Sequence, residues 1–339
     1  MFKRCSFYEH PFALSPSTGS VRTAFVLRAN GVSKSIYVYK NMNGMLMKLF
    51  FKQVNYLSAA LFAAILLAGC SGSSKTGDKY SQIVVFGASL SDNGNAVSIV
   101  PGLFPGAPYY PGRASNGLLW IDVVAAELGN ELKPFVNGGT NYAVGGARTC
   151  SISGASANPF DMCNQVVLYL AATLNKADAS ALYVIDTTAA GNNIFTVINN
   201  GLSNNEITTQ APTDIARLMD RLYDAGARKF LVTNVPDVGA TPRGQGLPSP
   251  ATATALSNGF NGTLNNELAN FRTAHSGVDV RLADFKSAVA IKTGFTNTTD
   301  PCVVNLVACA TPDTYTYWDT LHPTAATGRN MAKAALAVL

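Results

Sequence analysis

Two short stretches, far apart in the sequence, carry side chains that together could perform nucleophilic catalysis. Ser89 lies in I-V-V-F-G-A-S-L-S-D-N-G-N, directly after a run of β-branched and aromatic residues. Asp319 and His322 lie three residues apart in Y-T-Y-W-D-T-L-H-P-T-A. At this spacing a carboxylate can hold an imidazole in the tautomer that accepts a proton from a serine. The residues predict a serine nucleophile with a histidine base; the alternative is a serine and a histidine that only cap helices.

The small number of histidines restricts the choice of base. After the N-terminal segment the chain contains only His275 and His322. His275 lies in T-A-H-S-G, at the end of an expected helix, and has no carboxylate at the same spacing. We therefore expect His322 to be the general base and Asp319 to orient it.

The block around Ser89 resembles the first motif of the GDSL, or SGNH, family of lipases and esterases, which usually reads G-D-S-L-S-D. Three further blocks follow in the family's order: N-Y-A-V-G-G, A-G-N-N and D-T-L-H-P-T. Together they span residues 83–325. The resemblance implies that Ser89, Asp319 and His322 are the catalytic residues. Ala88 departs from the motif, because the family usually has Asp there. The departure affects the expected support of the turn more than the nucleophile itself.

The resemblance also implies an oxyanion hole. In N-Y-A-V-G-G the donor would be the N–H of Gly146, with Gly145 as the adjacent alternative. In A-G-N-N it would be the side chain of Asn192, while Asn193 stands where the family usually has Asp. The N–H of Ser89 completes the expected set, and one such donor lowers the barrier by roughly 3–4 kcal/mol. The alternatives are a tight strand exit at the glycines and an asparagine that caps the next helix.

The implied function is a serine esterase or lipase that hydrolyses carboxylic esters through an acyl-enzyme, with short to medium acyl chains favoured. Phospholipase or lysophospholipase activity and acyl transfer to an alcohol are alternatives within the family. A surface-binding lipoprotein that has lost the chemistry is an alternative from another class, favoured by the departures at Ala88 and Asn193. The expected partner is an ester or lipid substrate, and no cofactor is expected.

The residues between the blocks predict strands that alternate with helices, which favours an α/β class with a parallel sheet covered on both faces. The resemblance implies a three-layer α/β/α, flavodoxin-like SGNH fold with a central sheet of about five strands. Strands are expected at 83–86, 181–186, 229–234 and 278–283, with one more leading to the glycine block. Helices are expected at 120–128, 165–174, 213–226, 255–274 and 285–293. Ligand sites of such sheets lie beyond the carboxyl ends of the strands.

Loops at that edge should shape the cleft. Residues 101–117 are rich in Pro and Gly, and Leu103, Tyr109 and Tyr110 would either line the cleft or attach the loop to the core. Residues 235–250 follow a strand and should border the same cleft. Asn141 is expected to brace the glycine block.

The N-terminal part has the pattern of an export signal. Residues 45–69 contain two lysines, then an apolar run, and they end in L-A-G before Cys70. This resembles a bacterial lipobox, which implies lipidation of Cys70 and a polar tether over 70–79. The apolar run is short for the alternative, a transmembrane anchor. We expect residues 1–44 to be an extension outside the native protein and 80–339 to be one hydrolase domain.

Removal of this segment changes the charge balance. It contains eight of the 25 basic and one of the 20 acidic residues, so 17 basic and 19 acidic residues remain, and the net charge of +5 becomes about −2. The charge then gives no reason to expect nucleic acid as a partner. We expect an exported protein of the bacterial cell envelope, either secreted or held by lipid at Cys70. Ser71 resembles the signal for the outer membrane.

Four cysteines remain after residue 70. An exported protein meets an oxidising compartment, so two close pairs suggest the disulfides Cys150–Cys163 and Cys302–Cys309. A metal site is the competing interpretation. The sequence contains no C-x-x-C and few histidines, so no metal is expected.

Overall fold

The computed structural model describes residues 23–29, 32–38, 79–100 and 106–339, which belong to two units, 1–76 and 77–339. In the first unit, β1 (Thr23–Ala29) pairs antiparallel with β2 (Val32–Val38), a hairpin that the sequence pattern does not predict. The predicted signal peptide and Cys70 lie outside the described residues. Within the described ranges, no helix is long and apolar enough to cross a membrane.

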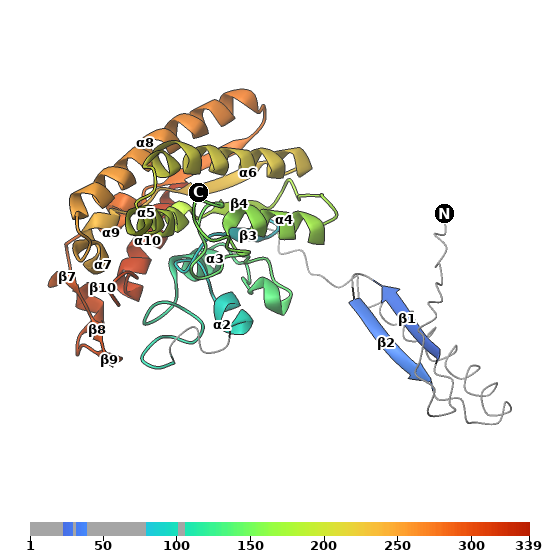
Figure 1. Cartoon of the computed structure of the whole chain (residues 1–339), viewed down its shortest axis with the longest axis horizontal. Helices are drawn as coiled ribbons and strands as arrows, with labels where there is room; N and C mark the ends of the chain where they lie inside the picture. Colours follow the sequence, from blue (N-terminus) through green and yellow to red (C-terminus); the bar gives the residue numbers. More distant parts are fainter. Residues whose placement is uncertain (1–22, 30–31, 39–78, 101–105) are drawn as a thin grey trace. The chain divides into compact units, whose positions relative to one another are not determined.

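The second unit is built on a parallel sheet of four strands in the order β3-β4-β5-β6 (Figure 1). Its strands are β3 (Ile83–Phe86), β4 (Leu182–Ile185), β5 (Lys229–Thr233) and β6 (Asp279–Ala283). Every residue of β3 and β4 is buried. Such continuous apolar runs are typical of strands covered on both faces.

The expected fifth strand is present only as an irregular segment beside β3. The N–H of Val85 donates to Thr140 O at 3.0 Å, and the N–H of Tyr142 donates to Val85 O at 2.8 Å. This pairing amounts to a single bridge between Val85 and Asn141. Glycines on both sides, at 138–139 and 145–146, turn the chain away before a regular strand can form. The sheet therefore has four regular strands where we expected about five.

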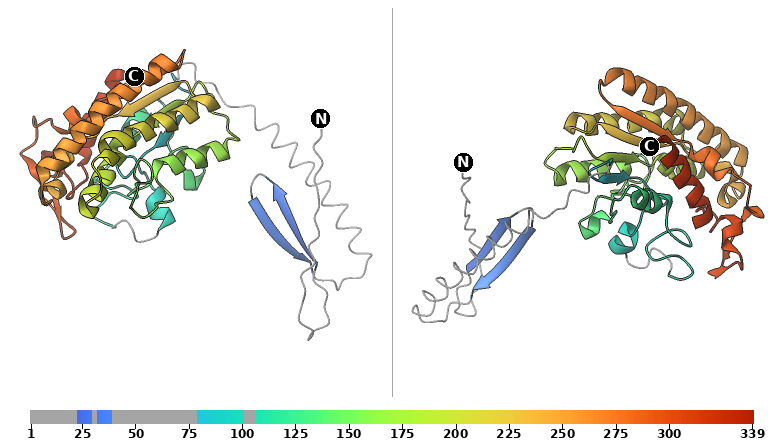
Figure 2. Two further views of the ribbon diagram at one scale, coloured as in Figure 1. Left: turned by 45° about the horizontal axis from the view of Figure 1, so that its top comes forward. Right: turned by 180° about the vertical axis from the view of Figure 1, so that it is seen from behind.

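Helices cover both faces, which confirms the three-layer α/β architecture (Figure 2). Alternate residues of each strand enter opposite cores: Val84 and Phe86 of β3 join one, Ile83 and Val85 the other. The first core is closed by α4 (Met162–Ala172), α5 (Ala190–Asn200), α6 (Ala211–Ala225) and α8 (Pro250–Ala274). The second is closed by α3 (Trp120–Glu127), α9 (Phe285–Val289) and α10 (Ala325–Val338).

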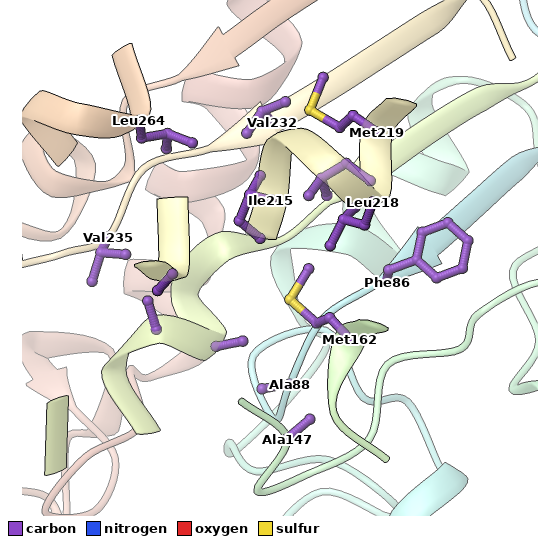
Figure 3. Packing of buried hydrophobic residues seen from close by; sticks show 14 of the residues in the cluster. Phe86, Ala88, Ala147, Met162, Ile215, Leu218, Met219, Val232, Val235 and Leu264 are labelled. Atoms are coloured by element: carbon purple, nitrogen blue, oxygen red, sulfur yellow. The ribbon is translucent and has the colours of Figure 1, made fainter. Parts of the chain in front are cut away.

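Figure 3 shows part of the first core, where Ile215, Leu218 and Met219 of α6 lie near Phe86 and Val232 of the sheet. The five predicted helices are all present, although α8 begins five residues earlier than expected and α9 ends four residues earlier. The sequence reading missed α5 and α10. Two short helices, α2 (Asn95–Ile99) and α7 (Pro242–Gln245), lie in loops.

A small C-terminal subregion precedes α10. There β7 (Asn297–Pro301) pairs with β10 (Tyr315–Tyr317), and β8 (Val303–Val304) forms a hairpin with β9 (Val307–Ala308). The disulfide Cys302–Cys309 closes this hairpin, and Cys150–Cys163 closes the loop before α4. Both predicted disulfides are thus confirmed.

Candidate active site

The turn after β3 places Ser89 at the carboxyl edge of the sheet. A Cβ at Gly87 would lie 2.7 Å from the Cβ of Asp186, so only glycine fits there. The side chain of Gln165, on α4, holds this turn with two hydrogen bonds. Its Oε1 accepts from the Gly87 N–H at 2.9 Å, and its Nε2 donates to Gly87 O at 2.8 Å. Gln165 therefore supports the turn in a chain that has Ala88 instead of Asp.

A buried carboxylate links the next turn to β4. Ser91 Oγ donates to Asp186 Oδ2 at 2.5 Å, and Trp120 Nε1 donates to Ser91 Oγ at 3.1 Å. Thr188 and Thr233 also donate hydroxyl hydrogen bonds to Asp186. Burial raises the pKa of Asp186, although the hydrogen bonds from Ser91 and Thr188 oppose this effect. The ends of three strands are thereby fixed close to Ser89.

Asp92 connects the serine loop with the glycine block. Its carboxylate is fully buried and accepts from the N–H groups of Gly94, Asn95 and Ala96. It also accepts from the Gly145 N–H at 2.7 Å. Burial raises the pKa of Asp92, and these backbone donors partly oppose the rise.

Asn141 braces the same region, as predicted. Its Nδ2 donates to Ser91 O at 2.7 Å and to Asn93 Oδ1 at 2.9 Å, and its Oδ1 accepts from the Ala143 N–H. The serine loop and the glycine block are therefore joined by side chains from both.

Ser89, His322 and Asp319 form one chain of hydrogen bonds. His322 Nε2 lies 2.9 Å from Ser89 Oγ, and His322 Nδ1 lies 2.8 Å from Asp319 Oδ2. Asp319 Oδ1 accepts from the N–H groups of Leu321 and His322 at 2.8 and 2.7 Å. The D-x-x-H spacing thus lets a single tight turn set the carboxylate against the imidazole.

Two influences act on the pKa of Asp319. Burial raises it, but the attraction of His322 and the hydrogen bonds from His322 and Leu321 outweigh burial, so the pKa lies well below its usual range. A carboxylate held in this way stays ionised. It can therefore stabilise positive charge on the imidazole when the ring takes up a proton.

Of the two glycines considered for the oxyanion hole, Gly146 keeps its donor available. The Gly145 N–H is used by Asp92, whereas the Gly146 N–H has no acceptor within the described part of the chain. Gly146 is exposed and has a φ of 81°, a conformation that favours glycine. Asn192 lies in the first turn of α5, and its Nδ2 donates to Ala147 O at 2.7 Å. That bond orients the amide and leaves its second N–H free to donate.

Asn193 holds the loop after the glycine block through hydrogen bonds to Thr149. Its Oδ1 accepts from the Thr149 N–H and its Nδ2 donates to Thr149 Oγ1, both at 2.9 Å. The amide can serve both bonds because it both accepts and donates, which an ionised Asp cannot do.

The sequence model of the family described as GDSL-like Lipase/Acylhydrolase matches residues 83–335. The chain belongs to this family. The match begins at β3 and ends within α10, so it covers all the residues of the candidate site.

Known proteins are similar to this chain over different shares of their own length. Lipase 1 of Photorhabdus luminescens is 33% identical over 54% of this chain, which corresponds to 26% of that protein. The thermolabile hemolysin of Vibrio parahaemolyticus is 26% identical over 76% of this chain and 63% of its own length. A GDSL esterase/lipase of Arabidopsis thaliana is 26% identical over 81% of this chain and 93% of its own. The chain thus spans less than two thirds of the two bacterial relatives.

Among solved structures, Est24, a carbohydrate acetylesterase from Sinorhizobium meliloti, has a similar fold. The superposition covers 75% of this chain and 95% of the Est24 chain. Its TM-score is 0.37 and its identity 16%. These values carry no conclusion about substrate.

Two cavities of this GDSL-like protein meet at Asn192. One, of about 50 Å³, contains Ser89 and is mainly apolar, lined by Ala88, Leu90, Val235, Pro236, Val238 and Leu321. The other, of about 580 Å³, is polar and open, and includes Gly146, Asn158, Thr196 and Arg243. Of the predicted segment 235–250, the first part borders the first cavity, through Val235, Pro236, Val238 and Thr241. A larger cavity of about 640 Å³, beside Lys286 and Tyr317, contains none of the residues that touch Ser89.

Tyr109 and Tyr110 have different surroundings. Tyr109 packs edge-on against Trp318, with ring centroids 5.9 Å apart, and its hydroxyl donates to Asp319 Oδ2 at 2.9 Å. Tyr110 is 41% exposed. Leu103 lies outside the described residues. The loop is therefore attached to the segment that carries Asp319, which is the second of the two expected possibilities.

The second histidine, His275, lies elsewhere. It follows α8 and precedes β6, at the amino edge of the sheet, whereas Ser89 follows β3 at the carboxyl edge. His275 Nε2 lies 2.7 Å from Asp220 Oδ1. This carboxylate comes from α6, 55 residues earlier in the sequence, so no carboxylate stands at the D-x-x-H spacing from His275, as expected. Within the described ranges no group of three or more His, Cys, Asp or Glu residues is arranged to hold a metal ion.

Proposed function

We propose that this GDSL-like protein hydrolyses carboxylic esters through an acyl-enzyme. The observation that supports this best is the unbroken hydrogen-bond chain from Asp319 through His322 to Ser89. His322 would take the proton of Ser89 as Oγ attacks the ester carbonyl. It would then give that proton to the departing alcohol, and a water molecule activated in the same way would release the acid.

Negative charge on the carbonyl oxygen would be met by the three expected donors. These are the N–H groups of Ser89 and Gly146 and the side-chain amide of Asn192. The bond from Asn192 to Ala147 O supports this role, because an oriented donor needs no rearrangement during the reaction.

We propose that the acyl group occupies the small apolar cavity. Its volume of about 50 Å³ is far smaller than those of the two larger cavities, about 580 and 640 Å³. Within the expected range of short to medium chains, this space favours the short end, such as acetyl to butyryl. A series of p-nitrophenyl esters should therefore give the highest kcat/KM at four carbons or fewer, and a rise toward decanoate would contradict the assignment.

The alcohol half would lie in the polar cavity. The Arg243 guanidinium stacks over Phe195 at 4.1 Å and has no carboxylate partner within the described part of the chain. Arg148, by contrast, pairs with Asp161 at 2.9 Å. One unneutralised cation in a cavity with no acidic lining residue supports esters of polar or anionic alcohols, the phospholipase alternative among them.

Replacing Ser89 by Ala tests the proposal directly. The variant should fold, lose turnover of p-nitrophenyl butyrate by at least about 10⁴-fold, and no longer react with a fluorophosphonate probe. Ser276→Ala is the control, because Ser276 is exposed and lies at the opposite edge of the sheet. A wild-type protein that neither turns over esters nor takes up the probe would support the non-catalytic alternative instead.

We further propose that the protein is exported and carries lipid on Cys70, at the outer membrane. The L-A-G-C pattern supports this, and two disulfides are typical of an oxidising compartment. Labelled palmitate should enter the wild-type protein in a bacterial host and be absent from Cys70→Ser. Equal labelling of both would contradict the proposal.

A further inference from the structure

The β8–β9 hairpin presents a group of exposed apolar side chains. Val304, Leu306 and Val307 are 56%, 58% and 71% exposed. The two strands are joined by Asn305 and Leu306, both with positive φ, 50° and 62°. Turns of this kind favour Asn followed by Gly, because only glycine adopts the second conformation without cost. A leucine there is unfavourable for the turn and exposes an apolar side chain to water.

The hairpin is also held at its base and lies close to the segment that carries Asp319. The disulfide Cys302–Cys309 closes its base. The Val303 N–H donates to Trp318 O at 2.7 Å, and Trp318 directly precedes Asp319. The tip therefore protrudes from the subregion that carries the base and its carboxylate.

We propose that this hairpin inserts its tip into the surface of a neutral or zwitterionic lipid aggregate. Three side chains are too few for a stable protein interface, which buries about 800 Å² on each partner. A lipid surface, in contrast, accepts single apolar side chains. From residue 293 to residue 328 the chain contains Asp300, Asp313 and Asp319 and no lysine or arginine. This acidic balance disfavours anionic lipid.

Leu306→Gly tests this surface, because glycine suits the turn better than leucine. The variant should be at least as stable as the wild type, yet bind phosphatidylcholine vesicles several-fold more weakly in co-sedimentation. Leu174→Gly is a closely matched control: Leu174 is 82% exposed with a φ of 55°, and it lies after α4 at the other edge of the sheet. All chains should carry Cys70→Ser, so that no acyl group binds the vesicles.

Binding is measured without turnover, so the result does not depend on the proposed esterase activity. Equal binding by Leu306→Gly and the wild type would overturn the assignment, as would absence of binding by the wild type. Stronger binding to phosphatidylglycerol vesicles would overturn the choice of lipid. Self-association that Leu306→Gly abolishes would show a second copy as the partner instead.

An independent observation concerns Tyr109. The geometry points to Tyr109 as a positioning residue for Asp319 and His322, an inference that rests on the proposed function. Its hydroxyl donates to Asp319 Oδ2, the oxygen that also faces His322 Nδ1. Each carboxylate oxygen of Asp319 then has two hydrogen-bond partners.

Contacts on both sides fix the phenol in place. Tyr109 packs on the buried Trp318. Farther along the loop, Ser115 Oγ donates to Pro323 O at 2.9 Å, and Asn116 Oδ1 accepts from the Ala325 N–H at 2.7 Å. Burial raises the pKa of Tyr109, and the charge of Asp319 acts in the same direction, so the hydroxyl remains a donor throughout the neutral range.

The phenol draws negative charge away from the carboxylate oxygen beside the imidazole. Among described side chains, His322 and Tyr109 are the titratable groups in contact with Asp319. The nearby Arg243 meets this turn through its backbone, with its guanidinium over Phe195. Without the phenol the carboxylate would attract a protonated imidazole more strongly, and the base would become available only at higher pH.

Tyr109→Phe keeps the packing and removes the hydrogen bond. It should lower kcat for p-nitrophenyl butyrate about 10-fold with KM unchanged. The acidic limb of the kcat/KM profile should move upward by about 0.5–1 pH unit. Tyr110→Phe, with an exposed neighbouring phenol, is the matched control.

A purely structural role for Tyr109 predicts an unshifted limb, and that result would overturn the inference. NMR spectra of isotope-labelled histidine provide a readout that needs no turnover. In Tyr109→Phe the ring resonances of His322 should differ from those of the wild type, because its partner carboxylate has lost a hydrogen bond, while those of His275 stay unchanged. No difference between Tyr109→Phe and Tyr110→Phe would overturn the inference even if the protein hydrolyses no ester.

Discussion

Among the described residues, two histidine–aspartate pairs with almost equal distances lie at opposite edges of the sheet. His322 lies 2.8 Å from Asp319, and His275 lies 2.7 Å from Asp220. Each imidazole side chain is 18% exposed. The second ring nitrogen of His322 faces Ser89 at 2.9 Å. His275 instead lies against the rings of Tyr223 and Phe271, both in tilted contacts, with centroids 4.1 and 4.4 Å away.

The carboxylates also differ. The side chain of Asp319 is 17% exposed and accepts two backbone N–H bonds and a phenol bond, whereas that of Asp220 is 47% exposed. A short His–Asp contact is therefore no evidence of a general base by itself. The pair needs a hydroxyl on its free nitrogen and a carboxylate that water does not compete for.

Replacing each histidine in turn should give the largest difference in kcat/KM between the two pairs. His322→Asn should lower kcat/KM for p-nitrophenyl butyrate by about 10⁴–10⁶-fold, because Ser89 loses its proton acceptor. His275→Asn should leave kcat/KM within about twofold, since it removes only contacts with two aromatic rings and with a half-exposed carboxylate, far from Ser89. Similar losses of kcat/KM in both variants would contradict the assignment of His322 alone as the base.

Replacing each aspartate should give a smaller contrast. Asp319→Asn should cost about 10³–10⁴-fold in kcat, because the amide cannot stabilise the charged imidazole and favours the wrong tautomer. Asp220→Asn should leave the steady-state constants unchanged. Activity that depended on Asp220 would mean that the amino edge contributes to the reaction.

Asn192, the proposed side-chain donor to the oxyanion, lies at the same edge as His322, and its removal tests whether Ser89, His322 and Asp319 suffice without it. Asn192→Ala should lower kcat by about 10²–10³-fold with little change in KM. Asn265→Ala, at an exposed position of α8, serves as the control for loss of an amide. If kcat stays the same in Asn192→Ala, the amide does not contact the reacting oxygen.

The contribution of Asp319 to the free energy of unfolding should decrease at acid pH. The pKa of Asp319 is lower in the folded protein than in the unfolded chain, so its stabilisation is complete above the unfolded value of about 4 and is lost as pH falls below it. The free energy of unfolding should therefore be lower in Asp319→Asn than in the wild type at pH 6. Urea titrations should show this gap narrowing at pH 3.5, and a constant gap would contradict the assigned pKa direction.

The sequence predicted much of the fold because the signals are local. The strands β3, β4 and β5 are short, mostly buried apolar runs in the sequence. The D-x-x-H turn fixes Asp319 against His322 within four residues. The spacing of the cysteines predicted both disulfides. Glycines around Asn141 interrupt the expected fifth strand. The segment has residues that favour strand pairing and glycines that favour turns, and the composition alone does not tell which of the two will form.

The sequence did not predict hydrogen bonds between side chains that lie far apart along the chain. Gln165 lies on an ordinary helix, 78 residues from the Gly87 turn that it holds. Tyr109 is 210 residues from Asp319, and Asp220 is 55 residues from His275. Nothing in the neighbouring residues indicates these contacts, since each depends on how distant elements pack. Asp92 could have been found, because it follows Ser91 within the first motif.

The disulfide Cys302–Cys309 has a practical consequence for recombinant production. Its hairpin holds the backbone just before Asp319, so a host that keeps thiols reduced should yield soluble chains whose carboxylate is poorly fixed. Purified material of this kind would give low specific activity despite a normal circular dichroism spectrum. Expression directed to the periplasm, or reoxidation with a glutathione pair, is the preparation that suits this molecule.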